Sequence, residues 1–311
     1  MSRERNRPNF FAGPYLDRRA ELRERADWIE EARRDASTLY VAAHGTTQLI
    51  HLEPEPRIAF LTGDHPAVRA ARPEQLVLLG WFRGTRCMLV ELDAGSWREL
   101  TAGQSFEELR PLSTRLPAEE AGLLAYARAL TIWRARQRFC GVCGAATRPE
   151  RAGHLIRCTN ESCGQEFFPR IDPAIIVLVT DGERALLGRQ ASWPPGRYST
   201  IAGFVEPGES LEDAVIREVD EETGVRIHDI VYDSSQPWPF PASLMLGFYA
   251  AAQPAAPITV GWELEDARWF TRDELEAGAV LLPPPQSISY RLIRTWMEGA
   301  HPPLRMHGEE K

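Results

Sequence analysis

Three glutamates and an arginine stand close together in the chain: Arg217, Glu218, Glu221 and Glu222. At 3.6 residues per turn, the glutamates share one side of a helix with apolar neighbours, namely Ala214, Val215 and Val219. Carboxylates on a face that packs inward repel one another and lose hydration, unless hard cations bind between them. We therefore expect a site for two or three Mg²⁺ or Mn²⁺ ions, with Glu218 and Glu222 as the main ligands.

Cations held by carboxylates suit one class of reaction, the in-line displacement at phosphorus. They neutralise a pyrophosphate, activate a water and stabilise the leaving oxygen. Glu221 is either a further ligand or the general base, and Arg217 can orient a carboxylate through a bidentate pair. The alternative is an exposed acidic helix with solvated glutamates, which the inward-facing positions disfavour.

Two cysteine pairs form a second candidate metal site. Cys140 and Cys143 are followed by Cys158 and Cys163, and four thiolates suit one tetrahedral, structural Zn²⁺ with no open position for chemistry. Disulfides are the alternative, but they need an oxidising compartment, and the N-terminal residues contain no apolar signal segment. His154 is a competing ligand, although its neighbours favour a strand there. Cys87 is expected to be a buried core thiol.

The carboxylates need a helix with defined ends. Ser210 is a good N-cap that Asp213 can answer, and Gly224 can take the left-handed conformation after the last turn. The surrounding apolar runs predict a mixed sheet closed by a C-terminal helix at 286–298. The expected strands lie at 174–179, 185–188, the residues leading into Gly203, 227–232, 244–251 and 267–271.

The first third of the chain predicts a separate strand-rich sheet. A charge-rich, exposed helix is expected at 18–34, and a second helix at 117–136 leads into the cysteine module. We interpret Arg110 as part of a surface ion pair. The expected strands lie at 38–43, 48–52, 58–61, 76–82 and 87–92.

Residues 203–225 carry the spacing G-x5-E-x7-R-E-U-x-E-E-x-G-U, where U is a bulky aliphatic residue. This is the Nudix box, and its fixed letters are Gly203, Glu209, Arg217, Glu218, Glu221, Glu222 and Gly224. Residues 235–243 match the array SQPWPFPxS. With the preceding cysteine pairs, the chain resembles the NADH pyrophosphatase (NAD-capped RNA hydrolase) family of Nudix hydrolases with a zinc ribbon.

The resemblance implies an α+β protein with three domains. A degenerate Nudix-like N-terminal α+β domain is expected at 1–136, a small zinc ribbon at 137–169, and a catalytic Nudix α/β/α sandwich with a mixed sheet at 170–311. It also implies hydrolysis of the pyrophosphate bond of NADH or NAD⁺ to AMP and the nicotinamide mononucleotide, and removal of the NAD cap from RNA 5′ ends. A homodimer is implied as well.

The resemblance adds site residues. The carbonyl of Ala202 is an implied metal contact, and Glu263 matches an extra carboxylate, with Glu265 and Asp266 as open competitors. Phe168, Phe204 and Ser289 are implied substrate contacts, with core packing as the alternative for each. The array supplies the others: Ser235, Gln236, Pro237, Trp238, Pro239, Phe240, Pro241, Ala242 and Ser243.

The alternating prolines of the array hold the backbone extended and present Trp238 and Phe240 to flat rings. A proline-rich surface loop with incidental aromatics is the alternative interpretation. Other enzymatic hypotheses are a Nudix hydrolase for ADP-ribose or dinucleoside polyphosphates, and one that prefers NAD-capped RNA. A non-catalytic nucleotide sensor and a structural zinc-ribbon adaptor are the non-enzymatic ones.

Composition describes an ordinary globular protein of 311 residues, with 43% hydrophobic and 26% charged residues. The net charge of −8 argues against a dedicated nucleic-acid surface. A local basic run, Arg134, Arg136 and Arg138, can hold phosphates or can be a solvated helix end. No apolar run reaches the length of a membrane span, and we expect a cytoplasmic protein.

Overall fold

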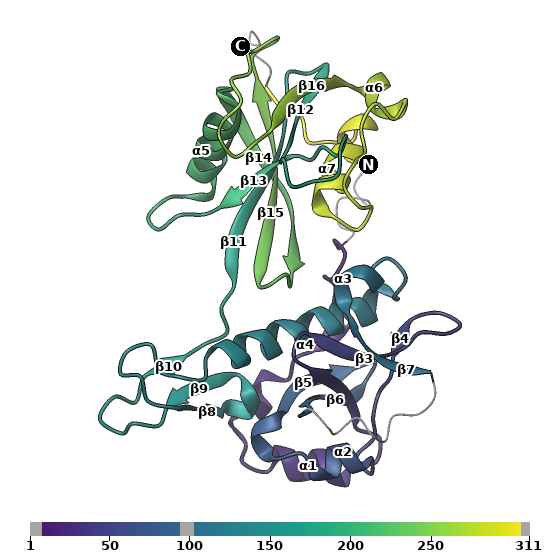
Figure 1. The fold of residues 1–311 in the computed structure, drawn as a ribbon, viewed down its shortest axis with the longest axis vertical. Helices are drawn as coiled ribbons and strands as arrows, with labels where there is room; N and C mark the ends of the chain where they lie inside the picture. Colours follow the sequence, from purple (N-terminus) through teal and green to yellow (C-terminus); the bar gives the residue numbers. More distant parts are fainter. Residues whose placement is uncertain (1–7, 94–102, 306–311) are drawn as a thin grey trace. The chain divides into compact units, whose positions relative to one another are not determined.

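The computed structural model describes residues 8–93 and 103–305, which fall into two compact units (Figure 1). Among the described residues, the first unit contains 8–10, 171–238 and 243–305. The second contains 11–93, 103–170 and 239–242. Among these residues, no helix is both long and apolar enough to cross a membrane.

The first unit is built on a mixed sheet in which the central strand β11 (Asp172–Thr180) runs parallel to β15 (Ser243–Ala252). The remaining pairings are antiparallel, in the order β14-β15-β11-β12-β16, with β13 on β11. The other strands are β12 (Arg184–Arg189), β13 (Ile201–Phe204), β14 (Ile227–Trp238) and β16 (Asp266–Thr271).

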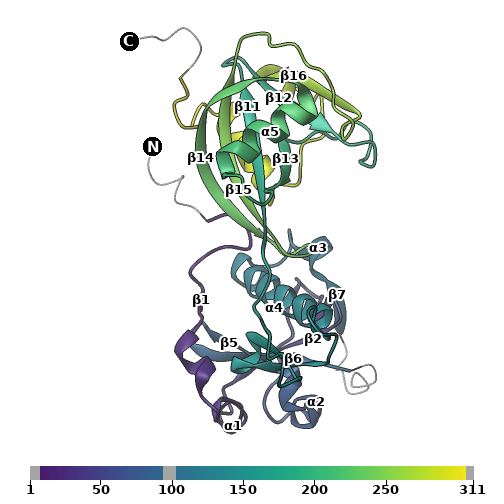
Figure 2. The ribbon, with the colours of Figure 1, turned by 90° about the vertical axis from the view of Figure 1, so that its left-hand side faces the viewer.

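Helices α5 (Leu211–Thr223) and α7 (Ile288–Met297) cover opposite faces of this sheet (Figure 1), and α6 (Arg272–Glu276) follows β16. Figure 2 shows α5 lying across the face of the sheet that is turned to the viewer. Successive residues of a strand point to opposite faces. Ile175 and Val177 therefore pack in the core with α5, whereas Ile176 and Leu178 pack in the core with α7. Burial on both faces explains the continuous apolar run of β11. The predicted α/β/α sandwich is confirmed.

The predicted ends of α5 are confirmed. The amide of Asp213 donates to Ser210 Oγ at 3.1 Å, and the amide of Ser210 donates to Asp213 Oδ2 at 3.1 Å. At the other end, Gly224 has φ 66°, a left-handed conformation that costs glycine little. These contacts are local, so the sequence fixes where the acidic helix begins and ends.

The second unit contains a sheet in the order β1-β5-β6-β2-β3-β4, with β7 on β3. Its strands are β1 (Leu16–Asp17), β2 (Leu39–His44), β3 (Thr47–His51), β4 (Arg57–Ile58), β5 (Leu76–Phe82), β6 (Thr85–Glu91) and β7 (Gln104–Glu108). Its helices are η1 (Ala20–Glu24), α1 (Trp28–Arg34), α2 (Pro66–Ala70), η2 (Pro73–Gln75), α3 (Leu109–Leu112) and α4 (Ala118–Arg136).

Five strands of each sheet share one order, whereas β4 pairs with β3 and β13 pairs with β11. The order β5-β6-β2-β3-β7 matches β14-β15-β11-β12-β16, and β6 is parallel to β2 as β15 is to β11. Helices α3 and α4 follow β7, just as α6 and α7 follow β16. In chain order, α2 stands between β4 and β5 as α5 stands between β13 and β14, and its five residues PAVRA contain no carboxylate. The sheet of the second unit therefore repeats the strand order of the first unit without the acidic helix.

The cysteine module forms a small antiparallel sheet in the order β10-β9-β8. Its elements are β8 (Thr147–Glu150), η3 (Arg151–Gly153), β9 (Leu155–Cys158) and β10 (Glu166–Phe167).

Two local predictions are wrong. Residues 18–34 are not one helix, because Arg25 is extended and turns its guanidinium to Asp27 at 2.6 Å, which separates η1 from α1. His154 is not a strand residue. It caps η3 and is buried, and its Nε2 lies 2.7 Å from the carbonyl oxygen of Leu78, so a long-range contact determines its position.

Candidate active site and metal centres

The two central carboxylates are buried on α5, where Glu218 is 8% and Glu222 is 4% exposed. Burial raises the pKa of Glu222 to about 8, with contributions from the negative charges of Glu218, Glu263 and Glu221. Burial also raises the pKa of Glu218. The ionised cluster is unfavourable as it stands, and hard cations are the ligands that would relieve it.

Arg217 organises the acidic residues around it. Its Nε and Nη2 bind Glu209 at 3.0 and 2.6 Å, the bidentate geometry that the sequence suggested for a carboxylate. Its Nη1 donates to Glu218 Oε1 at 2.8 Å and to Glu221 Oε2 at 3.1 Å. Nη2 also donates to the carbonyl of Phe204 at 2.9 Å. Arg217 thus fixes the orientation of Glu218 and ties α5 to the end of β13.

Strand β13 brings the backbone against the cluster. A Cβ atom at Gly203 would lie 1.9 Å from the carboxyl carbon of Glu218, so only glycine allows this approach. Ala202, the implied carbonyl ligand, precedes it and pairs with Ile176 of β11. The first glycine of the box is therefore a spacing residue for the acidic site.

Three carboxylates downstream competed for one role, and the structure separates them. Glu265 is paired with Arg189, and Asp266 accepts a hydrogen bond from the hydroxyl of Tyr198. Glu263, by contrast, is close enough for its charge to raise the pKa of both Glu218 and Glu222. The placement favours Glu263 as the extra carboxylate.

The loop that carries Glu263 is anchored to the C-terminal end of α5. The amide of Gly261 donates to the carbonyl of Glu222 at 2.8 Å, and Thr259 donates to Thr223 at 2.8 Å. A Cβ at Gly261 would lie 2.0 Å from the carbonyl oxygen of Glu221. Sequence reasoning missed Gly261. The only signal in the sequence was that Gly261 is an isolated glycine two residues before Glu263.

The proline-rich array ends β14 and begins β15, with Trp238 opposite Ser243. Pro239, Phe240, Pro241 and Ala242 connect the strands and belong to the second unit. There the guanidinium of Arg110 lies 4.5 Å from the centre of the Phe240 ring.

Gln236 has a position that its motif did not reveal. It is fully buried, its Nε2 donates to the carbonyls of Gln286 at 2.7 Å and Phe10 at 3.2 Å, and its Oε1 accepts from the amide of Ile288 at 2.9 Å. Its amide therefore holds the start of α7.

The three remaining candidates differ in exposure. Phe204 is 59% and Phe168 is 60% exposed, so neither is a core residue. Ser289 is buried, and its hydroxyl lies 2.8 Å from the hydroxyls of Ser199 and Thr200. For Ser289 the packing interpretation fits the structure, whereas Phe204 and Phe168 present open rings.

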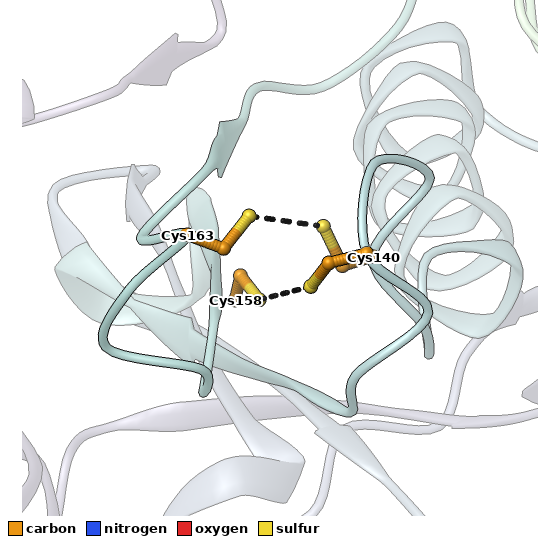
Figure 3. A group of neighbouring side chains, drawn as sticks. Cys140, Cys158 and Cys163 are labelled. Carbon is orange, nitrogen blue, oxygen red and sulfur yellow. Dashed lines mark hydrogen bonds between the residues drawn. The ribbon is translucent and has the colours of Figure 1, made fainter.

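The four ribbon cysteines converge on one point (Figure 3). Their sulfurs all lie within 4.8 Å of one another, with Cys140 to Cys163 at 3.8 Å and Cys143 to Cys158 at 3.4 Å. A tetrahedron with Zn–S bonds of about 2.3 Å has sulfurs about 3.8 Å apart. All five cysteines of the chain are free thiols, since a disulfide needs about 2.05 Å. The donors fit a closed zinc site.

Comparison with known proteins identifies the family. Residues 37–133 match the model of an NADH pyrophosphatase-like rudimentary NUDIX domain, 135–168 that of an NADH pyrophosphatase zinc ribbon domain, and 170–294 that of a NUDIX domain. The NAD-capped RNA hydrolase NUDT12 of Macaca fascicularis is 33% identical over 340 residues, covering 93% of this chain and 73% of the relative.

The chain belongs to the NADH pyrophosphatase family of Nudix hydrolases. Within this family, the NAD-capped RNA hydrolase NudC of Stutzerimonas stutzeri is 42% identical over 219 residues, covering 70% of this chain and 76% of the relative. A solved NUDIX hydrolase from Nitrosomonas europaea has 22% identity and a TM-score of 0.44, covering 55% of this chain and 94% of that chain.

Proposed function

We propose that this protein is an NAD(H) diphosphatase. It hydrolyses the pyrophosphate bond of NADH or NAD⁺ to AMP and the nicotinamide mononucleotide, and it removes the NAD cap from RNA 5′ ends. The observation that carries the proposal is the buried carboxylate pair Glu218 and Glu222, of which Glu218 accepts a hydrogen bond from Arg217, in a chain of this family. In the hydrolysis, a water oxygen bonds to one phosphorus, the bridging oxygen leaves with the other, and the water's protons pass to a carboxylate and to solvent.

We propose that the acidic cluster holds two or three Mg²⁺ or Mn²⁺ ions. Glu218 and Glu222 would hold them, together with Glu263 and the carbonyl of Ala202. Bound there, the ions would neutralise the pyrophosphate and lower the pKa of an attacking water. We assign Glu221 as a further ligand or as the proton acceptor; its side chain is 57% exposed and is bonded at one oxygen by Arg217.

For the flat rings of the substrate, we assign Trp238, Phe240, Phe204 and Phe168 as contacts. We assign the buried Gln236 and Ser289 to the substrate-binding segment through the backbone that they hold, since Gln236 accepts from the amide of Ile288 and Ser289 accepts from the amide of Thr200. The remaining residues of the array, Ser235, Pro237, Pro239, Pro241, Ala242 and Ser243, are proposed to shape the substrate-binding segment.

The ribbon cysteines are proposed to hold one structural Zn²⁺. The division into domains at 1–136, 137–169 and 170–311 is part of the same proposal. A homodimer and a cytoplasmic location stay predictions from the resemblance and the composition.

Product analysis by chromatography tests the function. The protein is incubated with NADH, NAD⁺, ADP-ribose, diadenosine tetraphosphate and NAD-capped RNA, with Mg²⁺ or Mn²⁺, beside a Glu222→Gln control. AMP and reduced nicotinamide mononucleotide formed fastest from NADH, and lost in the control, are expected. Fastest release of 5′-monophosphate RNA would make decapping the main role, faster cleavage of ADP-ribose would shift the substrate class, and no cleavage at all would favour a nucleotide sensor.

A further inference from the structure

The basic run at the end of α4 divides into two kinds of arginine. The side chain of Arg134 is 8% exposed and pairs with Glu91 at 3.2 Å, so it is a structural residue. Arg136 and Arg138 are exposed. Their guanidinium groups have no hydrogen-bond or ion-pair partner within residues 8–93 and 103–305. Interior packing therefore does not account for these two charges.

Each of these two arginines lines a cavity of the second unit. Arg138 borders one of about 520 Å³ between η2, α4 and the ribbon, and Arg136 borders one of about 560 Å³ beside α3. Gly45 and Ala135 line both cavities, so the two adjoin. Six arginines and four carboxylates line them together, a positive balance on a chain whose net charge is −8.

Aromatic rings accompany the charges. Phe139 follows Arg138, lines the first cavity and is 63% exposed. Phe240 lines the second cavity. An exposed ring beside unpaired arginines is the combination that binds single-stranded nucleic acid, because a base can stack on the ring while the cations hold phosphates.

We propose that this basic surface, defined by Arg136, Arg138 and Phe139 with the two adjoining cavities, binds the body of a single-stranded RNA whose capped 5′ end is the substrate. The inference rests on the proposed function. Free NADH has two phosphates, and the bond to be cut joins them. RNA carries further phosphates and bases, and these are the groups that the surface fits. A duplex would keep its bases stacked and leave Phe139 without a partner.

Steady-state kinetics on two substrates test the surface. The double variant Arg136→Ala/Arg138→Ala is compared with wild type on NADH and on an NAD-capped RNA of roughly 15 nucleotides, a length within the site sizes of single-strand binders. We expect kcat/KM for the RNA to fall about tenfold. The slope of log kcat/KM against log salt should become shallower by about 1.4, since each phosphate contact contributes about 0.7. Hydrolysis of NADH should be unchanged.

Arg148→Ala is the matched control. Arg148 is a ribbon arginine whose side chain is 62% exposed, and it is paired with Glu150 and is not among the described lining residues. The Arg148→Ala substitution removes one positive charge that lies outside the basic surface. The kcat/KM for the capped RNA and its dependence on salt should therefore match wild type. A loss equal to that of the double variant would mean that net charge alone matters, and would overturn the proposed site.

A binding measurement separates this inference from the function. Anisotropy of a labelled 5′-monophosphate RNA without a cap needs no catalysis, and Phe139→Ala and the double variant should each weaken its binding, with zinc content retained. Unchanged binding and unchanged RNA kinetics, in a protein that still cleaves NADH, would sink the surface and leave the function standing. A wild type that binds RNA but cleaves no NAD compound would sink the function alone.

Discussion

The backbone at Gly203 and the carboxylate of Glu218 are in direct contact, so close that a Cβ atom at residue 203 would lie 1.9 Å from the carboxyl carbon. The two residues come from β13 and α5, and their contact sets the distance between strand and acidic helix. The backbone of Gly203 has ordinary negative φ, so the constraint is space rather than backbone strain.

Gly203→Ala should therefore displace Glu218 and lower turnover by about 100-fold, the usual cost of misplacing a catalytic group by an ångström. It should also raise the Mn²⁺ concentration needed for half-maximal activity. Gly141→Ala is the control, because a Cβ there meets no atom within 4 Å. Wild-type kinetics and metal dependence in Gly203→Ala would mean that the helix shifts without consequence.

Glu222→Gln should lower turnover by roughly two orders of magnitude or more, because a carboxylate that holds the ions is lost. The same change should raise the melting temperature of the metal-free protein at neutral pH, because the pKa of about 8 makes the folded protein protonate Glu222, a cost that a neutral amide avoids. Kinetics and thermal unfolding measured in a chelator check both parts. Full activity would remove Glu222 from the metal site.

Trp238→Ala should weaken the binding of NADH by roughly 1–3 kcal/mol if the indole stacks a ring of the substrate. The comparison is Trp262→Ala, which removes an indole that is 89% exposed and lies outside the array. KM and direct binding report the effect. Equal KM and equal NADH affinity in the two variants would mean that the proline-rich array is an ordinary surface loop.

Cys143→Ser should lower zinc content and melting temperature together. The Ala145 amide lowers the pKa of the Cys143 thiol to about 7, which favours the thiolate that binds zinc. Metal analysis beside calorimetry measures both, and excess zinc should not restore the variant. Retained zinc with full stability would overturn the four-cysteine site.

His154 should make stability depend on pH. Burial lowers its pKa from 6.5 to about 4, so the folded protein keeps the imidazole neutral. The unfolded state binds the proton first as pH falls, so this contribution is complete above about pH 6.5 and is lost towards pH 4, by roughly 3 kcal/mol. His154→Gln should flatten that part of the curve, and unfolding in denaturant at several pH values measures it. If the free energies of unfolding of wild type and His154→Gln differ by the same amount throughout this pH range, the buried, neutral His154 is not the cause.

Local contacts explain what the sequence by itself determined. The cap at Ser210, the glycine at residue 224 and the spacing of Glu218 and Glu222 act within one helix, so their pattern predicts the helix and its acidic face. The four cysteines are similarly readable, because their spacing within two tight turns gives a tetrahedral set. Motifs of this kind carry the family assignment.

Tertiary packing decided the rest. Glu263, Glu265 and Asp266 are equivalent in sequence, and only the partners Arg189 and Tyr198 take two of them away from the acidic cluster. Likewise, Arg134 differs from Arg136 and Arg138 because distant segments supply it with the carboxylate of Glu91 and the carbonyl of Glu74. Such partners lie far along the chain, and the free energy of burying or pairing a charge depends on them rather than on neighbouring residues. The repeated strand order in the second unit is hidden in the sequence for the same reason. Packing keeps the order of the strands, although the acidic helix and its motif are absent there.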